Sequence, residues 1–254
     1  MSAEAFDLAI VWPALIAGLL VTATHVPLGI QVLRRGIVFI DLAVAQIAGL
    51  GVIVADWLGF EPHGAAVQAA ALSAALAGAL LLNWTEKHWP EVQEAVIGVT
   101  FIVAANAAIL LLATNPRGAE HLKDLLIGQI LWVNPAELPL VALISAVIFA
   151  LWFGLGERAG RIGFYLLFAC AVTVAVQLVG VYLVFTTLIV PALAARRMAR
   201  GRMAMSYALG AFGYALGLAL SLVSDLPPGP LIVCVMTGLG IVLLLSTSRL
   251  RAAG

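Results

Sequence analysis

Long apolar runs, separated by short charged or turn-forming segments, follow one another along almost the whole chain. Each run has about the 20 residues that a helix needs to cross the hydrocarbon core of a bilayer. Because backbone polar groups find no partners in hydrocarbon, such runs predict membrane-spanning helices. The first five predicted spans cover about residues 9–33, 37–59, 64–84, 92–113 and 138–157.

Residues 162–195 form an apolar stretch that is too long for one helix and lies between two basic segments. We therefore expect a broken pair of helices, hinged near Gly180. Two last spans are predicted at about 205–224 and 229–248, with an external turn at Asp225–Pro228. The total is eight or nine spans, and eight is the usual description if the broken pair is a single re-entrant excursion.

Another segment, residues 115–137, interrupts the pattern between the fourth and fifth spans with a short amphipathic piece. We expect it to form a re-entrant or interfacial helix. The predicted fold class is thus an all-α, polytopic transmembrane helical bundle. A single membrane domain covers residues 1–254, and no linker or soluble domain interrupts it.

Composition agrees with a membrane protein, since 63% of residues are hydrophobic, 10% are charged and the mean hydropathy is +1.12. Soluble domains carry about 25% charged residues. Eleven of the 13 Lys and Arg residues gather at the ends of predicted spans, at positions 34–35, 87, 158–161, 196–202 and 249–251. The positive-inside rule places these clusters and the C-terminus in the cytoplasm, and nine spans would place the N-terminus outside.

Few side chains inside the predicted spans can carry chemistry. Asp41 is an acid within the apolar part of a span, and intramembrane acids often mark ion pathways. Its alternative role is a shallow carboxylate paired with Arg34 or Arg35. His25 and Asn106 are also expected at membrane depth, where each could simply hydrogen-bond to a neighbouring helix.

The segment Gln177–Gly201, QLVGVYLVFTTLIVPALAARRMARG, carries a family resemblance. It is similar to the permease subunits of ABC importers for zinc and manganese, in which a stretch of the type VG..LV..LLI.PA..A precedes the loop that contacts the ATP-hydrolysing subunit. Further matches lie along nearly the whole chain, at Pro27-Leu28-Gly29, Ala95-Val96-Ile97-Gly98, Gly128, Val133, Pro135, Glu137 and Pro228-Gly229-Pro230. One departure is the cytoplasmic loop after the fifth span, which is reduced to Gly156–Gly163.

This resemblance implies a homodimeric, multi-pass permease in a bacterial inner (plasma) membrane. It would work with an ATP-binding subunit and an extracytoplasmic metal-binding protein, and would carry Zn²⁺ first and Mn²⁺ second. The chain has no G-x-x-x-x-G-K-[ST] motif, so ATP would bind to the partner subunit. The coupling contact would involve Ala194, Arg196, Arg197 and Arg200. Membrane lipid, and no nucleic acid, would surround the chain.

A second departure concerns the metal. Family members have an Asp followed four residues later by a His, so that both side chains share one helix face. Here Asp41 is present but Ala45 replaces the histidine, and Gln46 follows. Either His25 or His121 could restore nitrogen ligation for Zn²⁺. The alternative is an oxygen-only pathway through Asp41 and Gln46, which would prefer Mn²⁺.

Two other classes of protein compete with this interpretation. An ATP-independent secondary transporter of a small ion or solute should show inverted repeats and ionisable residues near the midplane, and the sequence has no convincing repeat. An intramembrane enzyme needs a nucleophile beside a base, and no serine is placed by sequence next to His25. We therefore expect a transport subunit rather than an enzyme.

Overall fold

The structure is a computed structural model that describes residues 3–61, 64–112, 128, 130–155, 158, 160–198, 200–224 and 226–252. Within these residues the chain forms nine α-helices and two short 3₁₀ helices, and no strand. The helices are α1 (Ala3–Arg35), α2 (Ile40–Trp57), α3 (Ala65–His88), α4 (Gln93–Leu112), α6 (Leu138–Leu155), α7 (Gly160–Val179), α8 (Val181–Ala194), α9 (Arg202–Ser224) and α10 (Pro228–Ala252), with η1 (Pro90–Val92) and η2 (Ile130–Trp132).

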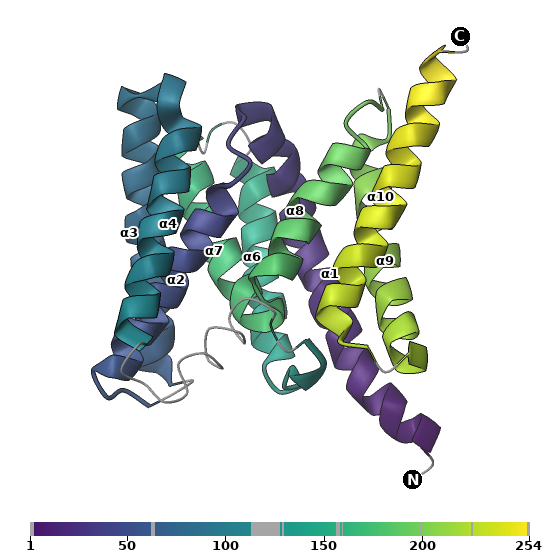
Figure 1. Ribbon diagram of the computed structural model, residues 1–254, viewed down its shortest axis with the longest axis horizontal. Helices are drawn as coiled ribbons and strands as arrows, with labels where there is room; N and C mark the ends of the chain where they lie inside the picture. Colours follow the sequence, from purple (N-terminus) through teal and green to yellow (C-terminus); the bar gives the residue numbers. More distant parts are fainter. Residues whose placement is uncertain are drawn as a thin grey trace.

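Eight of these helices are long and apolar enough to cross a membrane, and the ninth, α8, has only 14 residues. Figure 1 shows the start of α1 and the end of α10 at opposite ends of the bundle, as an odd number of passes requires. The predicted all-α polytopic bundle is therefore confirmed. The expected re-entrant helix falls mostly on residues outside the described ranges; its described part includes η2 and a turn at residues 135–137.

The broken pair lies where the sequence predicts it. Helix α7 ends at Val179 and α8 begins at Val181, so a single residue, Gly180, separates them. Gly180 has φ 84° and ψ 162°, a backbone conformation that residues with a Cβ rarely adopt. The chain can reverse here without a loop because this position is a glycine.

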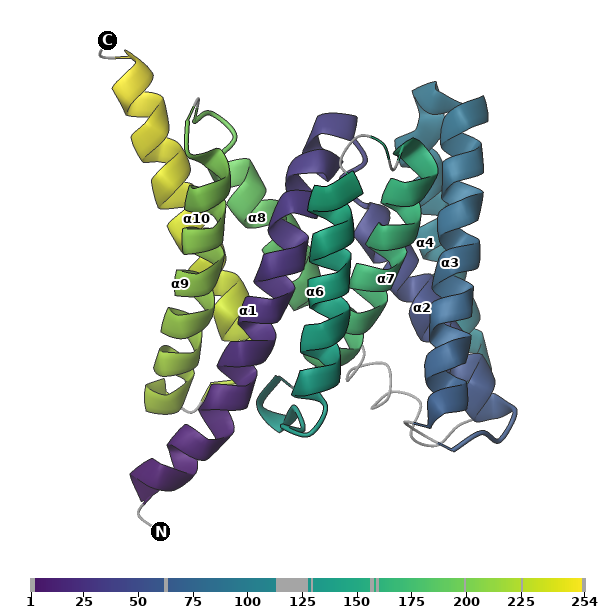
Figure 2. The ribbon, with the colours of Figure 1, turned by 180° about the vertical axis from the view of Figure 1, so that it is seen from behind.

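The helices pack as two groups joined along a seam (Figures 1 and 2). One group consists of α1, α8, α9 and α10, and the other of α2, α3, α4 and α7. Helix α6 packs against α1 and α7, and so lies along the seam. The consecutive helices α1 and α2 belong to different groups, so the short connection between them crosses from one group to the other.

A close backbone approach joins α1 to α8. A Cβ added at Gly29 would collide with the main-chain carbonyl oxygen of Leu188, so only glycine fits there. Small residues let helix backbones approach closely in membranes, where dispersion contacts rather than water exclusion drive packing. This contact explains the glycine of the Pro27-Leu28-Gly29 match and fixes α8 to α1.

Basic side chains gather at one end of the bundle. Arg34 and Arg35 lie in the last turn of α1 and Lys87 in the last turn of α3, at the same end as the segment between α8 and α9 (Figure 1). This end is the cytoplasmic end, because cytoplasmic segments carry the excess of Lys and Arg. The C-terminal end of α10 lies there too.

Candidate metal pathway and partner-docking elbow

Asp41 occupies the first turn of α2, directly after the short connection that follows α1. The residue is 1% exposed, and its Oδ1 atom has no hydrogen-bond partner. Both ion pairs found among the described residues involve a different acid, Glu86, and neither involves Asp41. Asp41 is therefore a buried carboxylate that keeps acceptor capacity unused within the part of the chain that the structure describes.

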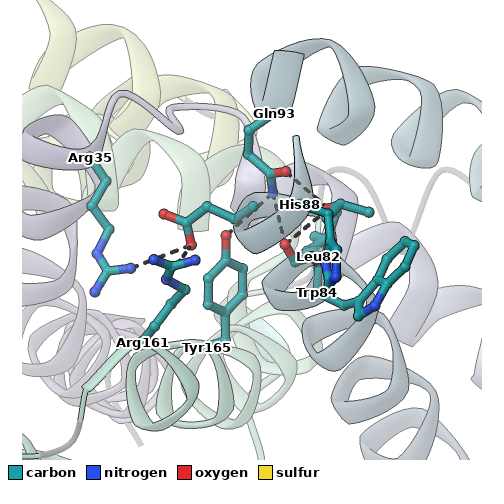
Figure 3. Close-up of polar contacts among 9 residues, drawn as sticks. Arg35, Leu82, Trp84, His88, Gln93, Arg161 and Tyr165 are labelled. Atoms are coloured by element: carbon teal, nitrogen blue, oxygen red, sulfur yellow. Dashed lines mark hydrogen bonds and ion pairs between the residues drawn. The ribbon is translucent and has the colours of Figure 1, made fainter. Parts of the chain in front are cut away.

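Arg35, one of the two expected partners of Asp41, has another partner. Its Nη1 atom lies 3.6 Å from Oε2 of Glu86 in α3, and Nε of Arg161 in α7 lies 3.7 Å from the same oxygen. Dashed lines from the Arg35 and Arg161 guanidinium groups mark these two ion pairs in Figure 3. The Arg35 guanidinium also lies 4.3 Å from the centroid of the Phe164 ring. Arg35 therefore pairs with Glu86 and not with Asp41.

Neighbouring polar side chains complete this arrangement, which we call the Glu86 cluster: Arg35, Glu86, Arg161, Gln93 and Tyr165. Gln93 begins α4, and its Nε2 donates to the Leu82 carbonyl at 2.9 Å and to the Tyr165 hydroxyl at 3.3 Å. Thr85 donates to Oε1 of Gln93 at 2.9 Å. The Glu86 cluster therefore ties α1, α3, α4 and α7 together at the cytoplasmic end (Figure 3).

Gln46 lies five residues after Asp41, which turns it by about 140° around the helix axis. It lines a small cavity of about 10 Å³ together with Ala45, Gly49, Ile53, Ala108, Val176 and Val181. Asp41 does not line this cavity. The structure therefore places the two side chains of the oxygen-only pathway on different faces of α2.

His25 is fully buried in α1. Its Nδ1 atom lies 3.0 Å from the Val21 carbonyl oxygen and 3.0 Å from the Thr24 hydroxyl. A carbonyl can only accept, so Nδ1 carries the proton and Nε2 keeps a lone pair. Nε2 has no hydrogen-bond partner among the described residues. A metal-ligating histidine commonly has this arrangement, with its second nitrogen donating to a backbone carbonyl.

The structure does not gather these side chains into a complete metal site. Among the described residues, no group of three or more His, Cys, Asp and Glu lies close enough to hold a metal ion. His121 lies outside the described residues. Asn106 is exposed on α4, and its amide donates to the Ile102 carbonyl of its own helix at 2.8 Å, so it makes no bond to another helix.

One side chain near Asp41 could not be singled out from the sequence. Oε1 of Glu94, in the first turn of α4, accepts a hydrogen bond at 3.3 Å from the backbone N–H of Phe39, two residues before Asp41. An acid at the start of a predicted span suggests a helix cap. Only the fold reveals that it caps α2, a different helix, and so helps to hold the turn that carries Asp41.

The described residues between α8 and α9, 195–198 and 200–201, form a second candidate site, which we call the arginine elbow. Ser206 donates to the Pro191 carbonyl at 3.0 Å, and Nη2 of Arg202 lies 3.4 Å from the Ala192 carbonyl, so the start of α9 is bonded to the last turns of α8. Arg196, Arg197 and Arg200 are exposed.

Ala194, which the resemblance also assigns to the coupling contact, is 3% exposed and packs beside Gly240 of α10. The arginine elbow is therefore a fixed, positively charged surface, and Ala194 directly before it is buried in the bundle.

These features define a polytopic helical membrane protein, and comparison with known proteins identifies its family. The sequence profile of the ABC 3 transport family matches residues 7–158 and 153–247. The chain therefore belongs to the ABC 3 transport family. It is a multi-pass bacterial inner-membrane transport subunit and not an enzyme.

Curated relatives align with most of the chain. It is similar to the high-affinity zinc uptake system membrane protein ZnuB of Haemophilus influenzae, with 25% identity over 264 residues, 95% of this chain and 99% of the relative. A probable metal transport system membrane protein of Chlamydia trachomatis is 25% identical over 257 residues, 90% of this chain and 86% of the relative. An uncharacterized membrane protein of Synechocystis is 28% identical over 245 residues, 87% and 85% of the two chains.

Solved structures share the fold. A chain of PsaBC from Streptococcus pneumoniae superposes with a TM-score of 0.74 at 20% identity, covering 92% of this chain and 90% of that one. A putative metal-chelate type ABC transporter in an inward-facing conformation gives a TM-score of 0.70 at 17% identity, covering 92% and 85%. At these identities the likeness establishes the arrangement of helices and not the cargo.

Proposed function

We propose that this chain is the membrane-spanning permease of an ATP-driven importer of divalent transition-metal ions, with Zn²⁺ as its first cargo and Mn²⁺ as its second. The observation that carries the proposal is Asp41, a buried carboxylate with an unpartnered oxygen in a chain of a transport family. An unpaired acid at membrane depth raises the free energy of the protein unless a cation binds to it. The names of two relatives, which describe zinc uptake and metal transport, support this cargo class.

The proposal includes a second copy of the chain. One protomer provides Asp41 without two further His, Cys, Asp or Glu residues beside it in the described part of the chain. In a homodimer with the pore along the symmetry axis, two copies of Asp41 would approach the same pathway. An extracytoplasmic metal-binding protein would deliver the ion from outside, and a separate ATP-binding subunit would drive the change of access from the cytoplasmic side.

His25 is the proposed nitrogen ligand that keeps the pathway suitable for Zn²⁺, because its Nε2 lone pair is free and its Nδ1 is fixed. His121 is the other histidine that could fill this role. If neither contributes, the pathway has oxygen donors only, and Asp41 is the first of them because Gln46 lies on a different face of α2. Such a pathway would favour Mn²⁺, because imidazole suits zinc and carboxylate and amide oxygens suit harder ions.

Transport by the purified complex tests the proposal. The permease is expressed with an ATP-binding subunit from the same organism, and the reconstituted complex is assayed for uptake of radioactive Zn²⁺, Mn²⁺ and Fe²⁺ with and without ATP. We expect an ATPase subunit to copurify and uptake of Zn²⁺ to require ATP. Uptake that proceeds without ATP, or purification of a functional transporter without any ATPase, would instead indicate a secondary transporter.

A further inference from the structure

Two adjacent arginines at the end of α1 have different surroundings. Arg35 is bound by Glu86 and lies over the Phe164 ring, so its charge is compensated inside the protein. Arg34 is exposed and forms no ion pair with any described residue. The two neighbouring arginines therefore have different roles: Arg35 stabilises the fold, and the charge of Arg34 is free to bind a partner from outside the chain.

Packing brings Arg34 to the arginine elbow. Val26 and Ile30 of α1 form a small apolar cluster with Ala192 of α8, and Leu33 and Tyr207 pack against it. The Tyr207 hydroxyl donates to a carbonyl of α1, that of Ala23, at 3.1 Å. The last turn of α1 is thus fixed beside the end of α8 and the start of α9.

Arg202, the first residue of α9, meets Arg34 at this junction. Burial, and after it the positive charge of Arg34, lowers the pKa of the Arg202 guanidinium. The Nε atom of Arg202 is buried and has no hydrogen-bond partner among the described residues, and its Nη2 atom has a long hydrogen bond, 3.4 Å, to the Ala192 carbonyl. Within the described part of the chain, no acid pairs with Arg34 or Arg202. The surplus positive charge of Arg34 and Arg202 would be balanced by an anionic group from outside the chain that binds the accessible parts of their guanidinium groups.

We propose that Arg34 and Arg202 extend the arginine elbow into one continuous surface that receives acidic side chains of the ATP-hydrolysing subunit. The surface combines arginines from α1, from the elbow and from α9, namely Arg34, Arg196, Arg197, Arg200 and Arg202. It rests on the proposed function, because it requires a soluble partner at the cytoplasmic face. It goes beyond the elbow itself by making the end of α1 part of the contact.

The geometry favours a protein carboxylate over a lipid phosphate. The elbow arginines lie on turns beyond the last helical turn of α8, and backbone bonds from Arg196 to Leu193 and from Met198 to Ala195, at 3.2 Å and 3.0 Å, fix these turns. A fixed basic platform at the water-facing end of the bundle suits bidentate pairing with carboxylates of a folded partner. Close packing at Gly29 joins α1 to α8. A movement of the ATPase subunit bound to these arginines would therefore act on both helices.

Binding of the ATPase subunit to the permease in nanodiscs of neutral phosphatidylcholine tests the proposal. Arg34→Gln is expected to weaken binding about 5-fold to 10-fold at low salt and to reduce the salt dependence of the dissociation constant, as loss of a charge pair across an interface does. Arg34→Lys, which keeps the charge, should lose less. The matched control is Arg161→Gln, which removes a cytoplasmic arginine of the Glu86 cluster and should leave binding unchanged.

Three outcomes would overturn the inference: unchanged binding and salt dependence for Arg34→Gln, an equal loss for Arg34→Gln and Arg161→Gln, or an effect of Arg34→Gln only on association with anionic lipid vesicles. The wild-type protein separates this inference from the proposed function. If wild-type permease does not bind the ATPase at all, the proposed function is contradicted. If it binds and Arg34→Gln binds equally well, only the role of Arg34 is contradicted.

Discussion

Two carboxylates near the cytoplasmic end of the bundle have opposite surroundings. Glu86 lies between Arg35 and Arg161, which come from two other helices, and its side chain is 17% exposed. Asp41 is 1% exposed, and no arginine or lysine pairs with it among the described residues. The acid that is more accessible to water is compensated, and the acid that is more deeply buried is not.

The arginines follow the same division. Arg35 and Arg161 are used to hold helices together, whereas Arg34 and the exposed arginines of the elbow have no acidic partner in the described residues. A charge that is compensated within the chain stabilises the fold. A buried charge that is left uncompensated, as at Asp41, raises the free energy of the isolated chain and is best explained by a ligand that binds there. The exposed arginines are solvated by water, and their surplus charge is available to a partner at the cytoplasmic face.

Replacing Asp41 should have the largest effect on function. Asp41→Asn removes the charge while keeping the size, and we expect metal uptake by cells to fall by about 100-fold or more, since even second-shell changes cost 10-fold to 100-fold in metal affinity. Expression and thermal stability should not fall, because no ion pair is lost. Asp56→Asn, at the other end of α2, is the matched control and should transport normally.

Charge reversal at the elbow should have the next largest effect. The double change Arg196→Glu and Arg197→Glu is expected to prevent assembly with the ATPase or to uncouple ATP hydrolysis from transport, because like charges across an interface repel. Stimulation of the ATPase by the permease is the measurement. Stimulation that equals that of the wild type would show that the elbow is not the coupling contact, provided that the variant reaches the membrane in its correct orientation.

Breaking the Glu86 cluster should affect stability rather than cargo. Glu86→Gln leaves Arg35 and Arg161 without a counter-charge, and we expect the free energy of unfolding to fall by about 1–3 kcal/mol, less than for a fully buried pair because Arg161 is 44% exposed. A lower unfolding midpoint in detergent would be the readout. An unchanged midpoint together with lost metal selectivity would contradict the division between the two acids.

The smallest expected effect concerns His25. His25→Ala should reduce Zn²⁺ uptake several-fold and leave Mn²⁺ uptake nearly unchanged, because a neutral imidazole contributes far more to binding of Zn²⁺. His121→Ala and the double variant complete the series. Equal Zn²⁺ uptake by all three variants would return both histidines to structural roles and leave the oxygen-only pathway.

Much of the fold was predictable because it depends on local sequence. The long apolar runs predicted the spans, and Gly180 marked the broken pair, since lipid dictates helix length and glycine permits the reversal. The pairing of Arg35 with Glu86 was not predictable, because those residues lie far apart in the sequence and the choice between Glu86 and Asp41 depends on which helices pack. The separation of Gln46 from Asp41 was also not predicted. Their closeness in the sequence suggested that they act together, but five residues of helix place them on different faces of α2.

The most direct test compares the two acids in one assay. Wild-type, Asp41→Asn and Glu86→Gln permeases, each assembled with the ATPase, are reconstituted in proteoliposomes, and ATP-dependent Zn²⁺ uptake is measured per folded complex. The account predicts that Glu86→Gln keeps most of the wild-type uptake while Asp41→Asn has almost none. Wild-type uptake by Asp41→Asn, or equal loss in both variants, would contradict the claim that the unpaired acid serves the metal and the paired acid serves the fold.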